Sequence, residues 1–455
     1  MNKEIFREYD IRGIADKELT NEVVEKIGKA YGTIIKKKGG KEIIVGNDNR
    51  TSSKRITKKL IEGIISTGVN VIKIGQSTTP QLYFAVNFLK KDGGVNVTGS
   101  HNPPEYNGFK VLVGNDAIHG KEIQELREIA EKEEFVKGKG KIKKKSIEKT
   151  YLKEIVKRVK VKRKVKLVID AGNGMASELA PKLFEMLGCE TTKLFCEKIE
   201  NYPNHIPDPS QEKNVKELQK KVVEEKAELG IAFDGDVDRI GIVDEKGNLI
   251  FGDKLLGILA KKELEKKPGA KIIMEVKCSQ GLEEWIKNLG GIPIIWKTGH
   301  SLIKAKMREE KAILAGEMSG HMFFANDWYG FDDALLAAAK VIEIVSSTSK
   351  KVSELVEEQP KYFASPEYRV DFSDKEKFEF VEKAKKHFSK NYKVIDIDGA
   401  RVLFENGWAL IRASNTQPKL IIRMEGKTKQ DLEQITKNFV SELNKIGKQE
   451  IKLTE

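Results

Sequence analysis

The stretch Thr98-Gly99-Ser100-His101-Asn102-Pro103 decides how the fold of this chain is interpreted. Residues 94–97 before it, Gly-Val-Asn-Val, form a short apolar run that is typical of a buried strand, and the Gly, Asn and Pro of the stretch predict a loop. The hydroxyl of Ser100 on such a loop, beside the imidazole of His101 and followed by Lys110, is placed for covalent chemistry. The alternative is that Ser100 caps a helix, because serine is common at that position. Three further loops favour the covalent role.

The second loop, Asp234-Gly235-Asp236-Val237-Asp238-Arg239, lies between apolar runs at 231–233 and 240–243 that predict strands. Its three carboxylates alternate along an extended backbone and project to one side, where they need a hard cation with oxygen ligands such as Mg²⁺. Glu245 stands at the twelfth position, as in an EF-hand, but Arg239 replaces the glycine that such a loop requires at the sixth, and strands flank the loop. A surface acidic turn is the simpler alternative.

Two later loops carry groups suited to a phosphorylated sugar. Gly316-Glu317-Met318-Ser319-Gly320-His321 follows an apolar run, and a carboxylate and a hydroxyl two residues apart suit neighbouring sugar hydroxyls. Arg412-Ala413-Ser414-Asn415-Thr416 lies between two predicted strands, where the arginine fork and the hydroxyls suit a phosphate. Without further context, the first is as typical of a polar turn and the second of a hairpin turn.

The bulk composition limits the classes of protein to consider. A chain of 455 residues is too long for one core and predicts three or four domains. The net charge of +13 fits either nucleic acid or a phosphorylated substrate, but the lysine-rich stretch 137–166 lacks interleaved aromatic residues and is interpreted as a solvated linker. Three scattered cysteines and the lack of a long apolar run predict a cytoplasmic protein that is neither secreted nor inserted in a membrane.

Strand and helix signals alternate over most of the chain. Apolar runs at 43–45 and 69–74 flank a helix-periodic stretch at 54–67, and the pattern repeats from residue 165, which predicts βαβ units and partly parallel sheets. Gly172-Asn173-Gly174 lacks the third glycine of a dinucleotide-binding fingerprint, so no nucleotide is expected.

The last part of the chain has a different pattern. A hairpin signal at Glu405-Asn406-Gly407 and a helical pattern at 429–446 predict an antiparallel α+β module. The expected domains are 1–145, 146–250, 251–360 and 361–455.

Residues 98–110, TGSHNPPEYNGFK, resemble the phosphoserine loop of the α-D-phosphohexomutase superfamily, in its phosphomannomutase/phosphoglucomutase branch. The other three loops follow in the order of that family, and the likeness covers essentially the whole chain. The resemblance implies an α/β fold, with three similar mixed-sheet α/β domains and a C-terminal antiparallel α+β domain around a central cleft. In order along the chain, the domains would carry the phosphoserine, bind the metal, recognise the sugar and bind the phosphate.

The resemblance also implies roles for individual residues. The metal ligands would be Ser100, Asp234, Asp236 and Asp238. The catalytic group would be Ser100, His101, Lys110, Arg12, Arg239 and His300. Substrate contacts would come from Tyr9, Lys277, Glu317, Ser319, His321, Arg412, Ser414, Asn415 and Thr416. Lys110 and His300 are the candidates for proton transfer, and a lysine in that role needs a lowered pKa, which neighbouring cations are expected to produce. Asn47 departs from the family pattern, which has arginine there, so the role of that charge stays open.

The implied activity interconverts the 6-phosphate and the 1-phosphate of mannose or glucose through phosphorylated Ser100 and a hexose 1,6-bisphosphate, with Mg²⁺ as cofactor. The nearest alternative is a phosphoglucosamine mutase, although that branch tends to Ser-Gly-Thr where this chain has Ser414-Asn415-Thr416. A non-catalytic, basic nucleic-acid-binding relative is a remoter alternative. The expected partner is a phosphosugar, with no nucleic acid and no membrane, and the chain is expected to be a monomer or a weak homo-oligomer.

Overall fold

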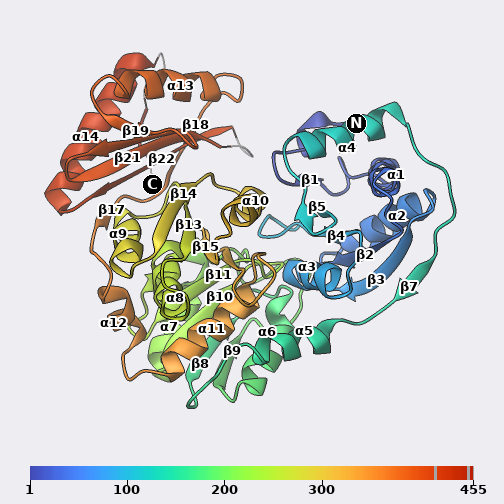
Figure 1. The fold of residues 1–455 in the computed structure, drawn as a ribbon, viewed down its shortest axis with the longest axis horizontal. Helices are drawn as coiled ribbons and strands as arrows, with labels where there is room; N and C mark the ends of the chain where they lie inside the picture. The colour runs from blue at the N-terminus through green and yellow to red at the C-terminus, as the bar shows by residue number, and fades with distance from the viewer. Residues whose placement is uncertain (415–417, 448–450, 454–455) are drawn as a thin grey trace.

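The computed structural model describes residues 1–414, 418–447 and 451–453. These residues form four sheets, of which the first three mix parallel and antiparallel pairs and the last is antiparallel throughout. Figure 1 shows the chain passing in order through four domains, with the first and the fourth on opposite arms of the molecule. The α/β fold class predicted from the sequence is therefore confirmed.

The first domain is built on a seven-stranded sheet in the order β1-β5-β4-β2-β3-β7, with β6 paired to β5. The strands that end near the later site, β4 and β2, are parallel, and β5 returns antiparallel to β4. Its elements are β1 (Ile11–Ile14), α1 (Asn21–Lys37), β2 (Glu42–Asn47), α2 (Ser53–Ile65), β3 (Asn70–Gln76), α3 (Thr79–Phe88), β4 (Gly93–Val97), β5 (Tyr106–Val113), β6 (Asp116–Ala117), α4 (Lys121–Lys132) and β7 (Ile142–Lys144).

The lysine-rich stretch is more structured than the sequence suggested. Its residues 142–144 are exposed, as a solvated linker would be, but they pair in parallel with β3 and close the edge of the first sheet. Lysine is well suited to an edge strand, because its charge discourages pairing with another chain. The stretch then leads down one side of the molecule to the second domain (Figure 1).

The second domain has a five-stranded sheet in the order β12-β11-β10-β8-β9. The hairpin of β10 and β11 is antiparallel, so the acidic loop between them lies at one end of the sheet. The elements are α5 (Glu148–Val156), β8 (Lys166–Asp170), α6 (Ala176–Met186), β9 (Glu190–Leu194), α7 (Lys216–Glu225), β10 (Leu229–Phe233), β11 (Ile240–Asp244) and β12 (Leu249–Ile250).

The third domain has a four-stranded sheet in the order β14-β13-β15-β16. Its helix α11 is mostly apolar, and all of its residues except Glu343 are buried, which is expected of a helix packed between two domains. The elements are α8 (Gly252–Lys266), β13 (Lys271–Glu275), α9 (Gln280–Asn288), β14 (Ile292–Trp296), α10 (His300–Glu310), β15 (Leu314–Gly316), β16 (Met322–Phe324), α11 (Ala334–Ser346) and α12 (Val352–Glu357).

The fourth domain has two helices on an antiparallel sheet in the order β17-β22-β21-β20-β19, with β18 paired to β22. Helix α14 begins with a capping box in which Thr428 and Asp431 satisfy each other's backbone N–H groups. The elements are β17 (Phe363–Ala364), β18 (Tyr368–Asp371), α13 (Lys377–Phe388), β19 (Lys393–Ile395), β20 (Ala400–Phe404), β21 (Gly407–Ala413), β22 (Lys419–Gly426) and α14 (Lys429–Ile446).

The domains are joined to unequal degrees by their cores. One continuous apolar cluster runs from α3 of the first domain, including Leu82 and Phe84, through the second domain to α11 of the third. The fourth domain has its own core and meets the third through a small cluster of Val276, Trp408 and Leu410. Among the described residues, no helix has the length and apolar composition needed to cross a bilayer.

Candidate active site

The Ser100 loop leaves the end of β4 and returns as β5, so no helix follows the serine. The helix-cap alternative is therefore wrong. Ser100 has a left-handed backbone (φ 49°) and is buried. Its amide donates to Thr98 Oγ1 at 2.9 Å, and Arg50 Nη2 donates to its carbonyl at 2.8 Å. Because an unusual φ costs energy in a non-glycine residue, these contacts hold the loop in a conformation it would not keep alone.

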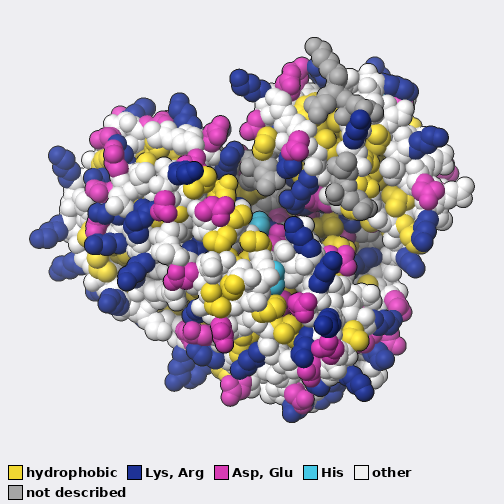
Figure 2. Space-filling model, turned by 180° about the vertical axis from the view of Figure 1, so that it is seen from behind, with side chains coloured by type: hydrophobic (Ala, Val, Ile, Leu, Met, Phe, Trp, Pro, Cys, Tyr) yellow, Lys and Arg dark blue, Asp and Glu magenta, His cyan; other side chains and the backbone are white. Residues whose placement is uncertain are grey.

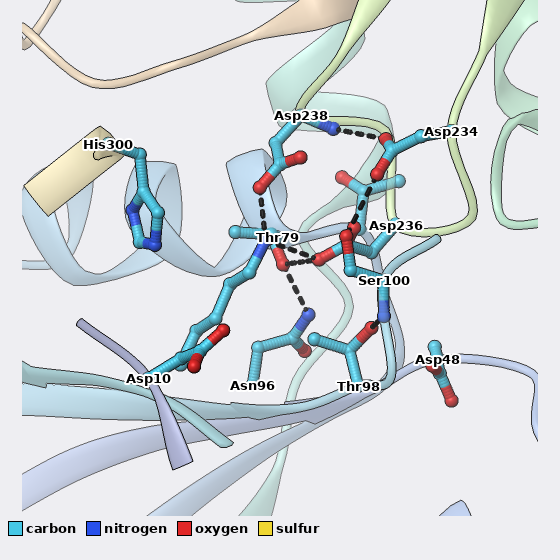
Figure 3. Close-up of polar contacts among 12 residues, drawn as sticks. Asp10, Asp48, Thr79, Asn96, Thr98, Ser100, Asp234, Asp236, Asp238 and His300 are labelled. Atoms are coloured by element: carbon cyan, nitrogen blue, oxygen red, sulfur yellow. Dashed lines mark hydrogen bonds and ion pairs between the residues drawn. The ribbon is translucent and has the colours of Figure 1, made fainter. Parts of the chain in front are cut away.

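The acidic loop between β10 and β11 meets the Ser100 loop directly (Figure 3). Asp234, Asp236 and Asp238 have no exposed surface, and each offers a carboxylate oxygen within 4.8 Å of the others. Ser100 Oγ donates to Asp234 Oδ2 at 3.0 Å. The surface-turn alternative is therefore wrong, because an exposed acidic turn would not be buried against another domain.

The same carboxylates fit an all-oxygen cation site. Oδ1 of Asp236 and Oδ1 of Asp238 are buried with no hydrogen-bond partner among the described residues. Burial and the charges of its two neighbours raise the pKa of Asp234 well above its usual range. Buried carboxylates are stable when paired or bound to a cation, and oxygen ligands are those that Mg²⁺ prefers.

Lys110 on β5 reaches the same loop from the first domain. Its Nζ lies 2.9 Å from Asp236 Oδ2 and also contacts Asp238 Oδ2. Burial alone would lower the pKa of Lys110, but the two carboxylates outweigh it and raise the pKa above its usual value. This direction is opposite to the one expected, because the neighbours of Lys110 are anions rather than cations.

His300, the other candidate for proton transfer, is the first residue of α10. Burial and the ammonium of Lys304, which lies 3.1 Å from His300 Nδ1, hold the pKa of His300 well below its usual range. Its Nε2 has no partner in the described part of the chain, and the ring packs edge-on against Tyr9, 5.7 Å away between centroids. These surroundings favour a neutral imidazole in which Nδ1 accepts from Lys304 and Nε2 carries the ring hydrogen.

Arg239 and His321 lie on the other side of the acidic loop. Arg239 Nε donates to His321 Nε2 at 3.0 Å, and His321 Nδ1 lies 3.0 Å from Asp332 Oδ2. Asp332 also accepts from Lys304 Nζ at 2.9 Å, so this one carboxylate contacts both His321 and Lys304. The second and third domains are joined here by polar contacts as well as by the shared core.

The Gly316–His321 loop follows β15. Glu317 Oε1 accepts from the amide of Gly299 at 2.7 Å, and Glu317 Oε2 accepts from Ser319 Oγ at 3.0 Å, so the two side chains face the same way, as the sequence predicted. Lys277, just after β13, places Nζ 2.8 Å from Glu367 Oε2 in the fourth domain. Glu317, Ser319 and Lys277 are, with His321, the predicted substrate residues that the third domain contributes.

The fourth-domain loop begins at the end of β21. Arg412 is buried, and its Nε donates to Asp398 Oδ2 at 3.0 Å. Ser414 is buried and its amide donates to the Lys419 carbonyl at 2.9 Å. Asn415 and Thr416, also predicted to contact the substrate, lie outside the described residues.

Two N-terminal residues, Tyr9 and Arg12, also belong to the predicted site. Burial raises the pKa of Tyr9 to about 12, and the charge of Arg412 acts against that rise, which places the two side chains in one electrostatic environment. Arg12 Nη2 donates to Asp10 Oδ2 at 2.5 Å. Figure 2 shows the hollow at the centre of the molecule, with histidine side chains visible in it.

His101 and Asn47 complete the predicted residues. His101 Nδ1 lies 3.1 Å from Ser100 Oγ, and burial together with Arg239 and Arg12 lowers the pKa of His101 well below its usual range. Asn47 is turned back on its own backbone, donating to the carbonyl of Asp48 at 2.8 Å.

The sequence did not predict four residues that support this site. They are Thr79, Asn96, Lys304 and Asp332, all buried and all bonded to predicted residues or to one another. Thr79 opens α3 in the run Thr78-Thr79-Pro80-Gln81, a recognisable helix start, but nothing in that signal says what the helix points at.

His205, for which the sequence indicated no role, forms polar contacts that hold a neighbouring loop in place. Its Nε2 lies 3.2 Å from both carboxylate oxygens of Asp170, and its Nδ1 lies 2.9 Å from the carbonyl of Ile206. A carbonyl and a carboxylate both accept, so these contacts favour the doubly protonated ring. Pro207, two residues on, packs against Gly172 and Gly235, next to the acidic loop.

Comparison with known proteins agrees with this geometry over the whole chain. Family models described as phosphoglucomutase/phosphomannomutase match residues 3–137 and 149–247 (alpha/beta/alpha domains I and II), 251–363 (domain III) and 367–442 (the C-terminal domain). Phosphomannomutase/phosphoglucomutase of Pseudomonas aeruginosa is 42% identical over 443 residues, which cover 97% of this chain and 96% of that protein.

Two further relatives agree. Phosphoglucomutase of Neisseria gonorrhoeae is 43% identical over 444 residues, covering 96% of each chain. A crystal structure of a phosphoglucomutase/phosphomannomutase family protein from Burkholderia thailandensis has a TM-score of 0.95 at 38% identity and covers 100% of both chains. Buried carboxylates beside a loop serine, on a fold of four such domains, define an enzyme of the phosphohexomutase class. The chain belongs to the phosphoglucomutase/phosphomannomutase family, as its sequence predicted.

Proposed function

We propose that this enzyme interconverts the 6-phosphate and 1-phosphate of mannose, glucose or both, with Ser100 as the phosphoryl carrier. The observation that carries the proposal is the 3.0 Å contact between Ser100 Oγ and Asp234 Oδ2, at the edge of three buried carboxylates. A hydroxyl buried in an acidic cluster is not a solvated surface group. It is well placed to carry a phosphoryl group beside a divalent cation.

The reaction has two transfers. In the first, the free hydroxyl of the sugar phosphate attacks the phosphorus on phosphorylated Ser100; the bond from Ser100 Oγ to phosphorus breaks, and a hexose 1,6-bisphosphate forms. The hydroxyl proton leaves to a basic group, for which Lys110 and His300 are the candidates; Lys110 must first lose its own proton, and His300 must present Nε2 in its unprotonated tautomer. After the bisphosphate turns over, the reverse transfer returns its other phosphoryl group to Ser100 and restores the proton to the sugar oxygen.

Asp234, Asp236 and Asp238, with an oxygen of phosphorylated Ser100, would hold Mg²⁺. Their fit rests on two buried carboxylate oxygens that have no hydrogen-bond partner among the described residues and on a purely oxygen ligand set. When bound, the ion neutralises charge on the transferring phosphoryl group. Arg12 and Arg239 add positive charge from the first and second domains.

The rest of the substrate spans the site. Glu317 and Ser319 would bind two neighbouring sugar hydroxyls, with Lys277 and His321 beside them. Arg412 and Ser414, together with Asn415 and Thr416, would bind the phosphate that is not reacting, because arginine forms a bidentate, charge-assisted contact with phosphate. Closure of the fourth domain over the bisphosphate would exclude water from the phosphoserine.

Two alternatives remain to be tested against this function. The relative kcat/KM on the 1-phosphates of glucose, mannose and glucosamine decides the preferred sugar, and the proposal expects glucosamine to be the poorest. A role in nucleic-acid binding predicts salt-dependent DNA affinity, which the proposal does not expect.

Replacement of Ser100 by alanine tests the proposed function. We expect Ser100→Ala to lower kcat by several orders of magnitude, because the covalent route is lost. Ser66→Ala serves as the matched control, since Ser66 lies in the same domain and its Oγ donates to the Gly63 carbonyl of the preceding helix. Turnover of Ser100→Ala close to that of the control would refute the proposal.

A further inference from the structure

One ligand of the proposed cation accepts hydrogen bonds from the first domain. Thr79, the first residue of α3, donates from Oγ1 to Asp236 Oδ2 at 2.5 Å, and its backbone N–H donates to the Asp236 carbonyl at 3.0 Å. Thr79 and Asp236 are 157 residues apart and both are buried. Two hydrogen bonds from one residue fix both the backbone and the side chain of the aspartate (Figure 3).

Asn96 sets the direction of the threonine hydroxyl. Asn96 Nδ2 donates to Thr79 Oγ1 at 2.9 Å. A hydroxyl has one hydrogen to donate, so an oxygen that accepts from an amide is free to direct its own hydrogen at the carboxylate. Asn96 lies on β4, four residues before Ser100, and pairs in register with Lys110 on β5.

These contacts leave one oxygen of Asp236 for a cation. Oδ2 accepts from Thr79 and from Lys110 Nζ, whereas Oδ1 is buried with no partner among the residues that the structure describes. A carboxylate held through one oxygen in this way keeps the other at a fixed place, and the orientation of a ligand by its hydrogen-bond partners strongly affects metal affinity.

The local sequence explains why a threonine can stand there. Thr78 forms a capping box with Gln81, and Pro80 lies in the first turn, so α3 begins at a defined residue. Thr79 is therefore held at the N-terminal end of the helix, which favours a nearby carboxylate. Leu82 and Phe84, further along α3, anchor the helix in the core shared with the second and third domains.

We propose that Thr79 and Asn96 are positioning residues that orient Asp236 for the cation, so that the first domain completes a metal site whose carboxylates all belong to the second. This inference rests on the proposed function only in that the three aspartates hold a divalent cation. It assigns to the Thr79–Asn96 pair a role in metal affinity rather than contact with substrate.

Binding of Mn²⁺ to the purified full chain, followed by electron paramagnetic resonance, tests this role without turnover. We expect Thr79→Val, which keeps the shape and removes the hydroxyl, to raise the Kd for Mn²⁺ by roughly tenfold to a hundredfold. Thr79→Ser, which keeps the hydroxyl, should bind within about threefold of wild type. Thr57→Val is the matched control, because Thr57 is buried in the same domain and its Oγ1 has no partner in the described chain; it should bind as wild type does.

Asn96→Leu provides a second test that leaves Thr79 in place. It should raise the Kd by severalfold, because the hydroxyl loses the donor that directs it. If Thr79→Val does not fold, as judged by its thermal unfolding beside Thr57→Val, the comparison of Asn96→Leu with wild type decides. Wild-type affinity in a folded Thr79→Val, or in Asn96→Leu in that case, would overturn the proposal. If wild type binds Mn²⁺ but Asp236→Asn binds it equally well, both the cation site and the positioning role fail, whereas activity lost with Ser100→Ala still supports the phosphoryl carrier.

Discussion

The two ends of the site differ in how they are built. At the Ser100 end, four loops and helix starts from the first three domains meet in a buried, hydrogen-bonded cluster on top of one continuous core. At the Arg412 end, a domain with its own core meets the third domain through a small apolar cluster and a larger set of polar contacts. One of these contacts is Arg401 Nη1, which donates to the Val276 and Cys278 carbonyls at 2.7 and 2.9 Å.

This difference matches what each end has to do. Phosphoryl transfer depends on positioning, so a rigid, preassembled group of carboxylates suits the end that carries Ser100. A bisphosphate that must turn over needs the other end to release it, and a small interface separates at low cost compared with a shared core. We therefore expect the Ser100 end to stay fixed and the fourth domain to open and close.

Removal of one of the three carboxylates tests the metal site at the Ser100 end. We expect Asp236→Asn to weaken Mg²⁺ binding by more than the tenfold to hundredfold typical of a supporting residue, since it removes a ligand itself. The chain should stay folded, because the change also relieves repulsion among three buried anions. Calorimetric titration of Mg²⁺ measures the loss, and activity abolished by EDTA should return with Mg²⁺. Full activity of wild type in excess chelator would contradict the metal site.

The proposed phosphate site at the Arg412 end is tested by removing the Arg412 side chain. Arg412→Ala removes a charge-assisted contact of about 1.5–3 kcal/mol, so KM should rise by at least about tenfold while kcat changes less. Lys383→Ala, an exposed cation on α13 of the same domain, is the control and should leave KM unchanged.

Small-angle scattering adds a structural measurement to the same variant. Sugar phosphate should make wild type more compact and Arg412→Ala less so. An unchanged KM in Arg412→Ala would place the phosphate site elsewhere and remove the basis for a mobile end.

A smaller, pH-dependent change in stability tests whether His205 supports the Ser100 end of the site. Burial alone would lower the pKa of His205, but the bond to Asp170 outweighs it and raises the pKa. A raised folded-state pKa stabilises the protein fully below the ordinary value of about 6.5 and loses that effect as pH rises through the folded-state pKa.

The change in stability follows from that sign. His205→Gln should therefore lower the free energy of unfolding by about 1 kcal/mol at pH 6 and by less at pH 9, measured by urea denaturation. Asp170→Asn should cost a similar amount, and the double variant little more than either, because the pair acts as a unit. Equal losses at both pH values would show that His205 acts by packing rather than by charge.

Much of this architecture was predictable from the sequence, for reasons visible in particular residues. Alternating apolar runs and helical periods predicted the α/β fold, and Glu405-Asn406-Gly407 predicted the hairpin of the fourth domain. The aspartates at 234, 236 and 238 were recognised as one cation site, but the expected extended backbone was wrong. The Val237 amide donates to the Asp234 carbonyl at 3.2 Å and Val237 has a φ of 68°, so a tight turn brings the three carboxylates together.

Contacts between distant segments were not predictable in the same way. Thr79 and Asp236 are joined only by docking of two domains, and a threonine at a helix start is explained locally by capping. The surroundings of Lys110 were misjudged for the same reason, since the sequence near it contains no sign of the two carboxylates that raise its pKa.

The central claim is that Ser100 carries the phosphoryl group between the two ends of the sugar. The most direct measurement is the intact mass and peptide map of the enzyme after brief exposure to glucose 1,6-bisphosphate, and again after addition of excess glucose 1-phosphate. The account predicts one phosphoryl group, on Ser100, that appears with the bisphosphate and passes to the monophosphate at a rate matching turnover. A phosphoryl group on another residue, or one on Ser100 that exchanges far more slowly than turnover, would contradict it.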